Sequence, residues 1–202
     1  MKISFAATTL AGLLGVASVA SAGPIPYANV GVENASTYTF IAAATGNITA
    51  YFYGSTAGYT NDLSMLVNGV DTGIRGLNNH TSPYGLALDL GPVTAGDVLV
   101  FRLNNISPGG VGPWYSNKAM NYDGVNHVYS TDFAGDLVIP AGTFVAFEDL
   151  PYGGDLNYND EDFVFTNVRA VTGVPEPTTV LLFALGLGGM LFVRRKTVEI
   201  KG

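Results

Sequence analysis

The sequence predicts an all-β protein, an antiparallel β-sandwich or jelly roll of about eight strands. Three observations support this class. The chain is rich in Thr, Tyr, Val and Phe, which favour strands, and poor in Lys and Glu. Short apolar runs are separated by turns that contain Gly, Asn or Pro. Residues 23–173 hold no sustained helical periodicity, and about 150 residues suffice for one domain with a core.

Eight runs are candidate strands, and turn residues separate them. In chain order they are residues 38–43, 48–54, 62–69, 85–91, 97–105, 127–133, 143–149 and 162–168. The runs 143–149 and 162–168 are apolar on nearly both faces, so we expect them to be central strands. An acidic segment lies between these two runs and is expected to connect them.

The N-terminus has the layout of a secretory signal peptide. Residues 1–22 contain one Lys, then an apolar run, then small residues at Ala20 and Ala22. Cleavage is expected after Ala22.

The C-terminus holds a short apolar segment followed by basic residues. Residues 180–193 are uncharged and would span about 21 Å as a helix, whereas a bilayer core is about 30 Å thick. Arg194, Arg195 and Lys196 follow at once, which predicts a cytoplasmic tail and an exported body. The signal peptide predicts the same topology.

Pro175, Glu176 and Pro177, the short apolar helix and the Arg-rich end together resemble the PEP-CTERM sorting signal of Gram-negative bacteria. The resemblance implies processing near the tripeptide by an exosortase-type membrane protease, after transient insertion in the inner membrane. It also implies association with the cell envelope and with the exopolysaccharide of a biofilm. An ordinary single-pass anchor is the alternative, although such anchors usually run nearer twenty apolar residues.

The expected organisation has three parts. They are a signal peptide at 1–22, an extracellular β domain at 23–173 and the sorting signal at 174–202, with a transmembrane helix at about 178–193 and a basic tail at 194–202.

The exported body is acidic. Between Gly23 and Gly173 there are fourteen Asp and Glu residues against four Lys and Arg residues, a net charge of about −10. Such a body repels phosphate backbones, so we expect no nucleic-acid partner. Cysteine is absent, so no disulfide stabilises the domain.

The segment FEDLPYGGDLNYNDEDF, residues 147–163, concentrates six carboxylates with no basic residue. Its D-x-N-x-N order is typical of the alternate oxygen ligands of a calcium loop, and the turn at 151–154 allows the chain to reverse. It is not an EF-hand, because Asp160 stands where that loop needs Gly and Thr166 where it needs Glu. The sequence predicts Ca²⁺ ligands at Glu148, Asp149, Asp155, Asn157, Asn159 and Asp160.

Two alternatives remain for this segment. It could be a solvated acidic loop, although clustered like charges repel by about 1 kcal/mol per pair even in water. It could also hold catalytic carboxylates, but the sequence does not show their separation.

The same segment is similar to the end of an uncharacterised bacterial extracellular domain, whose signature is F-E-D…D-x-x-[YF]-N-D. The matching residues here are Phe147-Glu148-Asp149, Asp155 and Tyr158-Asn159-Asp160. The resemblance implies an exported β domain without an established activity, which often precedes a PEP-CTERM tail.

We expect no enzyme. The two histidines lack metal-ligand spacing, no G-x-S-x-G motif is present, and no cysteine is available as a nucleophile. The leading hypothesis is an exported, non-catalytic, calcium-stabilised surface or matrix protein. The alternative is a carbohydrate-binding module with an aromatic platform at Trp114 and Tyr115.

Overall fold

The computed structural model describes residues 25–173, in which alternating apolar residues build eleven strands. The strands are β1 Thr37–Ala42, β2 Gly46–Gly54, β3 Asn61–Val67, β4 Val70–Gly76, β5 Ala87–Val93, β6 Val98–Asn105, β7 Trp114–Tyr115, β8 Val128–Phe133, β9 Gly142–Phe147, β10 Glu161–Thr166 and β11 Val168–Gly173. The signal peptide, the Pro-Glu-Pro tripeptide, the C-terminal apolar segment and the basic tail lie outside the described residues.

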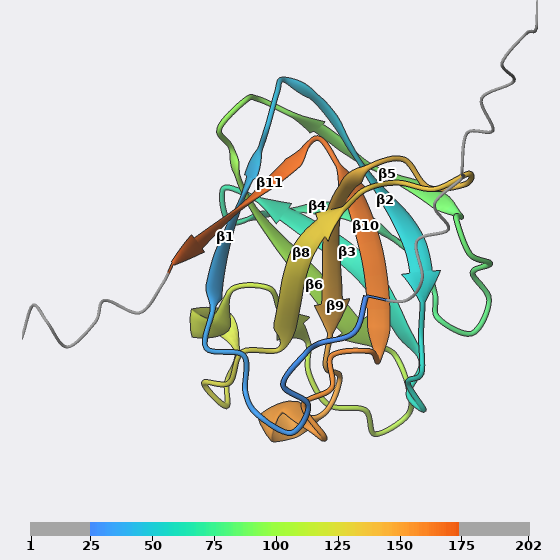
Figure 1. Ribbon diagram of the computed structural model, residues 1–202, viewed down its shortest axis with the longest axis vertical. Coiled ribbons are helices and arrows are strands. Elements are labelled where there is room, and N and C mark those ends of the chain that lie inside the picture. The colour runs from blue at the N-terminus through green and yellow to red at the C-terminus, as the bar shows by residue number, and fades with distance from the viewer. Residues whose placement is uncertain (1–24, 174–202) are drawn as a thin grey trace, which may run out of the picture.

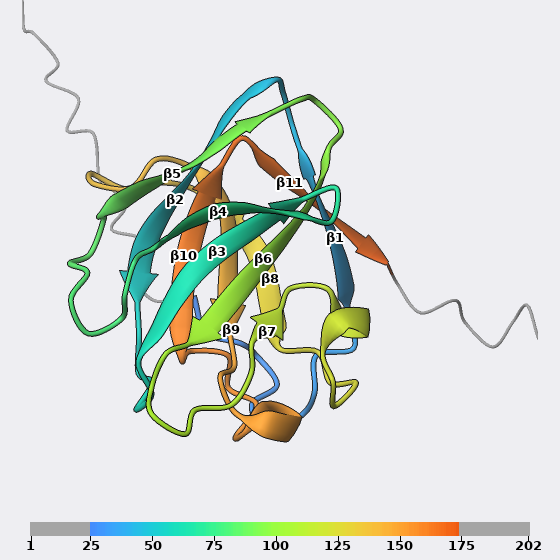
Figure 2. The same ribbon diagram turned by 180° about the vertical axis from the view of Figure 1, so that it is seen from behind.

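The strands form two antiparallel sheets. The first has the order β11-β1-β6-β3-β4, with β7 beside β6, and the second has the order β5-β2-β10-β9-β8. Figure 1 looks onto the second sheet, and Figure 2, from behind, looks onto the first. The predicted all-β class with antiparallel pairing is therefore confirmed.

The main core lies between the two sheets. Phe40 and Phe101 from the first sheet meet Phe163 and Phe165 from the second, and the rings of Phe101 and Phe165 stack with centroids 3.7 Å apart. This face-to-face arrangement is that of a β-sandwich.

A second apolar cluster covers the outer face of the second sheet. It contains Phe144 of β9 and Val164 of β10, and Tyr27 and Tyr158 lie over them. Strands β9 and β10 are thus buried on both faces, as their sequence predicts.

The prediction of about eight strands was too low, because β4, β7 and β11 were missed. Strand β4 reads VDTGIRG, which is polar, and forms because Asn68 and Gly69 make a tight turn with φ of 49° and 83°. Asn167, with φ of 62°, turns the chain from β10 into β11, which pairs with β1. Strand β7 has only two residues.

Helix is scarce in the described part of the chain. Residues 25–173 contain two short 3₁₀ turns, η1 Lys118–Met120 and η2 Pro151–Gly153. Within that range no helix has the length and apolar character needed to cross a membrane.

Candidate metal centre

The acidic segment connects β9 to β10 as a closed loop at one end of the sandwich (Figure 1). Phe147 and Glu161 are opposite each other in the antiparallel pair, and the Asp160 N–H donates to the Phe147 carbonyl at 3.1 Å. The Asp149 N–H donates to Asp160 Oδ2 at 2.9 Å. Both ends of the loop are therefore fixed, and the expected chain reversal after Leu150 is present.

One group of acidic and amide side chains belongs to this loop, and Glu148 is its buried member. This side chain is fully buried, its Oε1 accepts from the Tyr158 N–H, and its Oε2 has no partner among the described residues. Asn157 donates to Asp155 Oδ2 at 2.7 Å, and its buried Oδ1 has no partner within residues 25–173.

Burial raises the pKa of Glu148 to about 8. The negative charges of Asp160 and Asp155 act in the same direction, and the hydrogen bond from the Tyr158 backbone opposes them. We call Glu148, Asp155 and Asn157 the outer group.

A second group of polar side chains, the inner group, consists of Asp149, Glu161 and Asn61. Glu161 precedes Phe163 by two residues on β10, so its side chain enters the space between the sheets. It is 0 % exposed, and neither carboxylate oxygen has a partner among the described residues.

The residues around Glu161 come from different parts of the chain. Burial raises the pKa of Glu161 well above its usual value, and among the surrounding charges that of Asp149 contributes most. Asn61, at the start of β3, donates from Nδ2 to Asp149 Oδ2 at 2.8 Å. The Asn61 Oδ1 is buried and has no donor in the described part of the chain.

Asp160 lies between the two groups. Burial raises its pKa to about 6, and the nearby charge of Asp149 adds to this effect. The charges of both Asp149 and Asp155 act on it, one from each group.

The structure separates the six predicted ligands. Glu148, Asp155 and Asn157 are in the outer group, Asp149 is in the inner group and Asp160 is between them. Asn159 belongs to neither, because its Oδ1 accepts from the Thr56 hydroxyl at 2.6 Å.

Sequence analysis missed Glu161 and Asn61 as site residues. The alternation of β10 could have predicted that Glu161 is buried, because Glu161 shares a face of the strand with Phe163 and Phe165. No sequence signal links Asn61 to Asp149, which is 88 residues away.

Chemically, the inner group can hold a proton or a hard cation. Within residues 25–173, no three His, Asp or Glu side chains form a complete metal-ligand set by themselves. The inner group instead combines two carboxylates with an amide oxygen, and oxygen donors of this kind suit Ca²⁺.

The aromatic platform expected at Trp114 is absent, and this prediction is wrong. Trp114 is 0 % exposed, stacks on His127 with centroids 3.9 Å apart and donates from Nε1 to the Asp149 carbonyl at 2.7 Å. Tyr115 is half-buried beside it. A core residue cannot offer its ring face to a sugar, so Trp114 helps to position the acidic loop instead.

Comparison with protein families matches residues 173–196 to the PEP-CTERM protein-sorting motif. No curated protein and no solved structure matches the chain. The resemblance of the β domain to an uncharacterised extracellular domain therefore stays a prediction. The motif supports the prediction of an exosortase substrate that is exported to the cell envelope.

Proposed function

We propose that this protein is an exported, non-catalytic component of the cell surface or extracellular matrix, stabilised by one calcium ion in its acidic loop. The sorting motif supports export and processing by an exosortase. Association with exopolysaccharide or a biofilm is part of the proposal.

The calcium proposal rests on Glu161, whose carboxylate is fully buried and has no hydrogen-bond partner in the described chain. A buried carboxylate without a partner costs several kcal/mol, so it must take up either a proton or a cation. A proton on one Glu161 oxygen would leave the other Glu161 oxygen without a hydrogen-bond donor. Asn61 Oδ1 also lacks a donor in the described chain. A cation would instead be neutralised by Glu161 and Asp149 and could take Asn61 Oδ1 as a further ligand.

The chemistry of the ligands favours calcium over other metals. The inner group offers only oxygen atoms, whereas Zn²⁺ prefers nitrogen and sulfur. Ca²⁺ accepts six to eight oxygen ligands in flexible geometry, and backbone carbonyls and water commonly complete its shell. Exported proteins also meet calcium at high concentration.

The position of the inner group suits a structural ion. Asn61 belongs to the first sheet and Glu161 to the second, so an ion between them would join the sheets at one end of the core. The chain has no cysteine that could make such a cross-link covalently. Full burial of Glu148 and Glu161 also argues against contact with a substrate, which supports a non-catalytic role.

Thermal unfolding of the exported protein tests the calcium proposal. We expect the Tm to be higher in calcium than in chelator, and magnesium to replace calcium poorly because it demands near-ideal octahedral geometry. Glu161→Gln should remove most of the calcium response. Asp132→Asn is the matched control, because Asp132 is an exposed carboxylate on β8.

A Tm that is equal in calcium and in chelator would contradict the proposal. So would a Glu161→Gln protein with an undiminished calcium response.

A further inference from the structure

Two of the four basic residues of the exported body lie in one row on the outer face of the first sheet. Ser64 of β3 is opposite Arg75 of β4 and also opposite Arg102 of β6. The neighbours Leu63 and Met65 point into the core, so the row faces outward. Neighbouring strands are about 4.8 Å apart, which puts the two arginine backbones roughly 10 Å apart.

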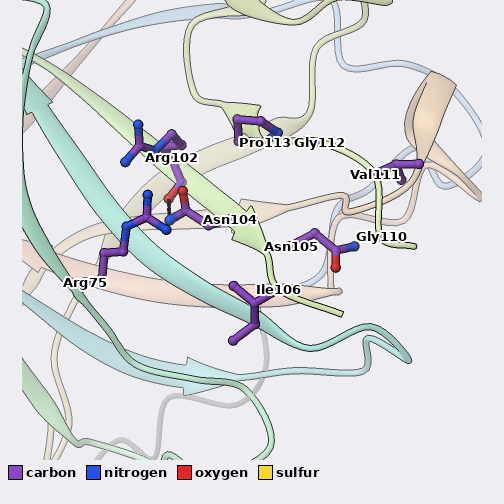
Figure 3. Close-up of a pocket in the computed structure, with 9 residues that line it drawn as sticks. All are labelled: Arg75, Arg102, Asn104, Asn105, Ile106, Gly110, Val111, Gly112 and Pro113. Carbon is purple, nitrogen blue, oxygen red and sulfur yellow. Dashed lines mark hydrogen bonds between the residues drawn. The ribbon is translucent and has the colours of Figure 1, made fainter. Parts of the chain in front are cut away.

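Both arginines line one hollow, which has a volume of about 250 Å³. Figure 3 shows their guanidinium groups on the same side of the hollow, with Asn104 next to them. Asn105, Ile106 and residues 110–113 complete the lining, and Ile106 and Pro113 add apolar surface.

Contacts within the domain hold Arg102 in place but leave the Arg75 side chain without a direct partner among the described residues. Arg102 donates from Nε to Ser64 Oγ at 2.9 Å and from Nη2 to Asp71 Oδ2 at 2.5 Å, so its guanidinium is held in place. The Arg75 side chain is exposed and makes no hydrogen bond or ion pair within residues 25–173. Asp62 and Asp71 are nevertheless near enough to act on it electrostatically.

A third donor lies in the same hollow. Asn105 Oδ1 accepts from the Ser107 N–H at 3.0 Å, which fixes the orientation of the amide. Its Nδ2 is buried and has no acceptor in the described part of the chain. Gly110 packs so closely on this amide that a Cβ there would lie 2.1 Å from Asn105 Oδ1.

We propose that this hollow binds the carboxylate of a uronic-acid sugar residue. Guanidinium groups match a carboxylate in shape and charge, and Asn105 Nδ2, on the other side of the hollow, is a donor for another oxygen of the same sugar ring. The volume suits a single sugar ring rather than a larger ligand, and Ile106 and Pro113 offer apolar contact for its C–H face. The inference is independent of the calcium proposal, because the arginine hollow and the inner group share no residue.

The test is an NMR titration of the exported protein with methyl glucuronide, with methyl glucoside as the matched neutral ligand. We expect saturable shifts of the Asn105 side-chain amide with the glucuronide and none with the glucoside. Arg75→Gln should weaken glucuronide binding at least tenfold and leave the fold intact, since the Arg75 side chain makes no hydrogen bond or ion pair in the described chain. Arg169→Gln is the matched control, because Arg169 is an exposed arginine on β11 outside the hollow.

Three results would overturn the proposal as a whole, and a fourth would overturn the assignment to a sugar. The first three are absence of glucuronide binding, equal binding of the glucoside, and equal weakening by Arg75→Gln and Arg169→Gln. Inorganic phosphate and a Glu-rich peptide are titrated in parallel, and tighter binding of either would refute the sugar assignment.

Discussion

Without calcium, the stability of the exported protein is expected to fall as the pH rises from about 5 to about 8. The pKa of Glu148 is about 8 in the folded protein and 4.5 as its ordinary value, and the pKa of Asp160 is raised from 3.8 to about 6. The folded state therefore binds more protons than the unfolded state in this window. A group with a raised folded pKa contributes its full stability below the unfolded pKa, and this is lost as the pH rises through the folded pKa.

The size of the effect follows from the same values. One pKa unit corresponds to about 1.4 kcal/mol, so deprotonation of Glu148 costs about 2–5 kcal/mol once solvent screening is allowed for. For a domain of this size that is a decrease in Tm of roughly 10 °C.

The assay is thermal unfolding by circular dichroism at four pH values between 5 and 8, in chelator and in calcium. Glu148→Gln keeps an acceptor for the Tyr158 N–H but cannot ionise, so it should flatten the decrease in chelator. Asp132→Asn removes an exposed carboxylate and should leave the slope unchanged. In calcium the decrease should be smaller, since a cation in the inner group offsets the negative charge that Asp149 exerts on Asp160. A Tm in chelator that is constant or rises with pH would refute the reasoning.

Three further outcomes are expected. Trp114→Phe should destabilise the protein by about 1–3 kcal/mol in denaturant titration, because the buried carbonyl of Asp149 loses its donor; a change below 0.5 kcal/mol would contradict this role. Asn159→Ala should lower the Tm slightly but leave the calcium response intact, since its side chain bonds to Thr56 and to neither group; loss of the response would make it a ligand after all. Replacing residues 175–177 with alanine should leave the C-terminal segment on the exported protein by intact mass, whereas normal processing would contradict the sorting assignment.

Much of the fold can be read from the sequence, because alternation and turn residues act locally. The eight predicted runs correspond to strands, and the face shared by Phe163 and Phe165 is the core face. Strands β4 and β11 were missed because their partners stabilise them more than their own composition does. Strand β4 is a polar hairpin arm on β3, and β11 is an edge strand on β1.

The candidate site could be predicted only in part. The charge of Asp155 acts on Glu148, as expected for two residues of one short loop. The D-x-N-x-N spacing does not fix the orientation of Asn159, whose Oδ1 accepts from the hydroxyl of the distant Thr56. The inner group forms only when the two sheets pack together and bring Asn61 beside Asp149. These residues are far apart in the sequence, so no local pattern predicts their contact.

The most direct test of the account is a calorimetric calcium titration of the exported protein after removal of bound metal. We expect saturable binding of one calcium ion per chain, greatly weakened in Glu161→Gln and unchanged in Asp132→Asn. At a hundredfold excess over Kd this ion should stabilise the fold by about 2.7 kcal/mol. Absence of calcium binding by the unmodified protein, or equal affinity in Glu161→Gln, would contradict the account.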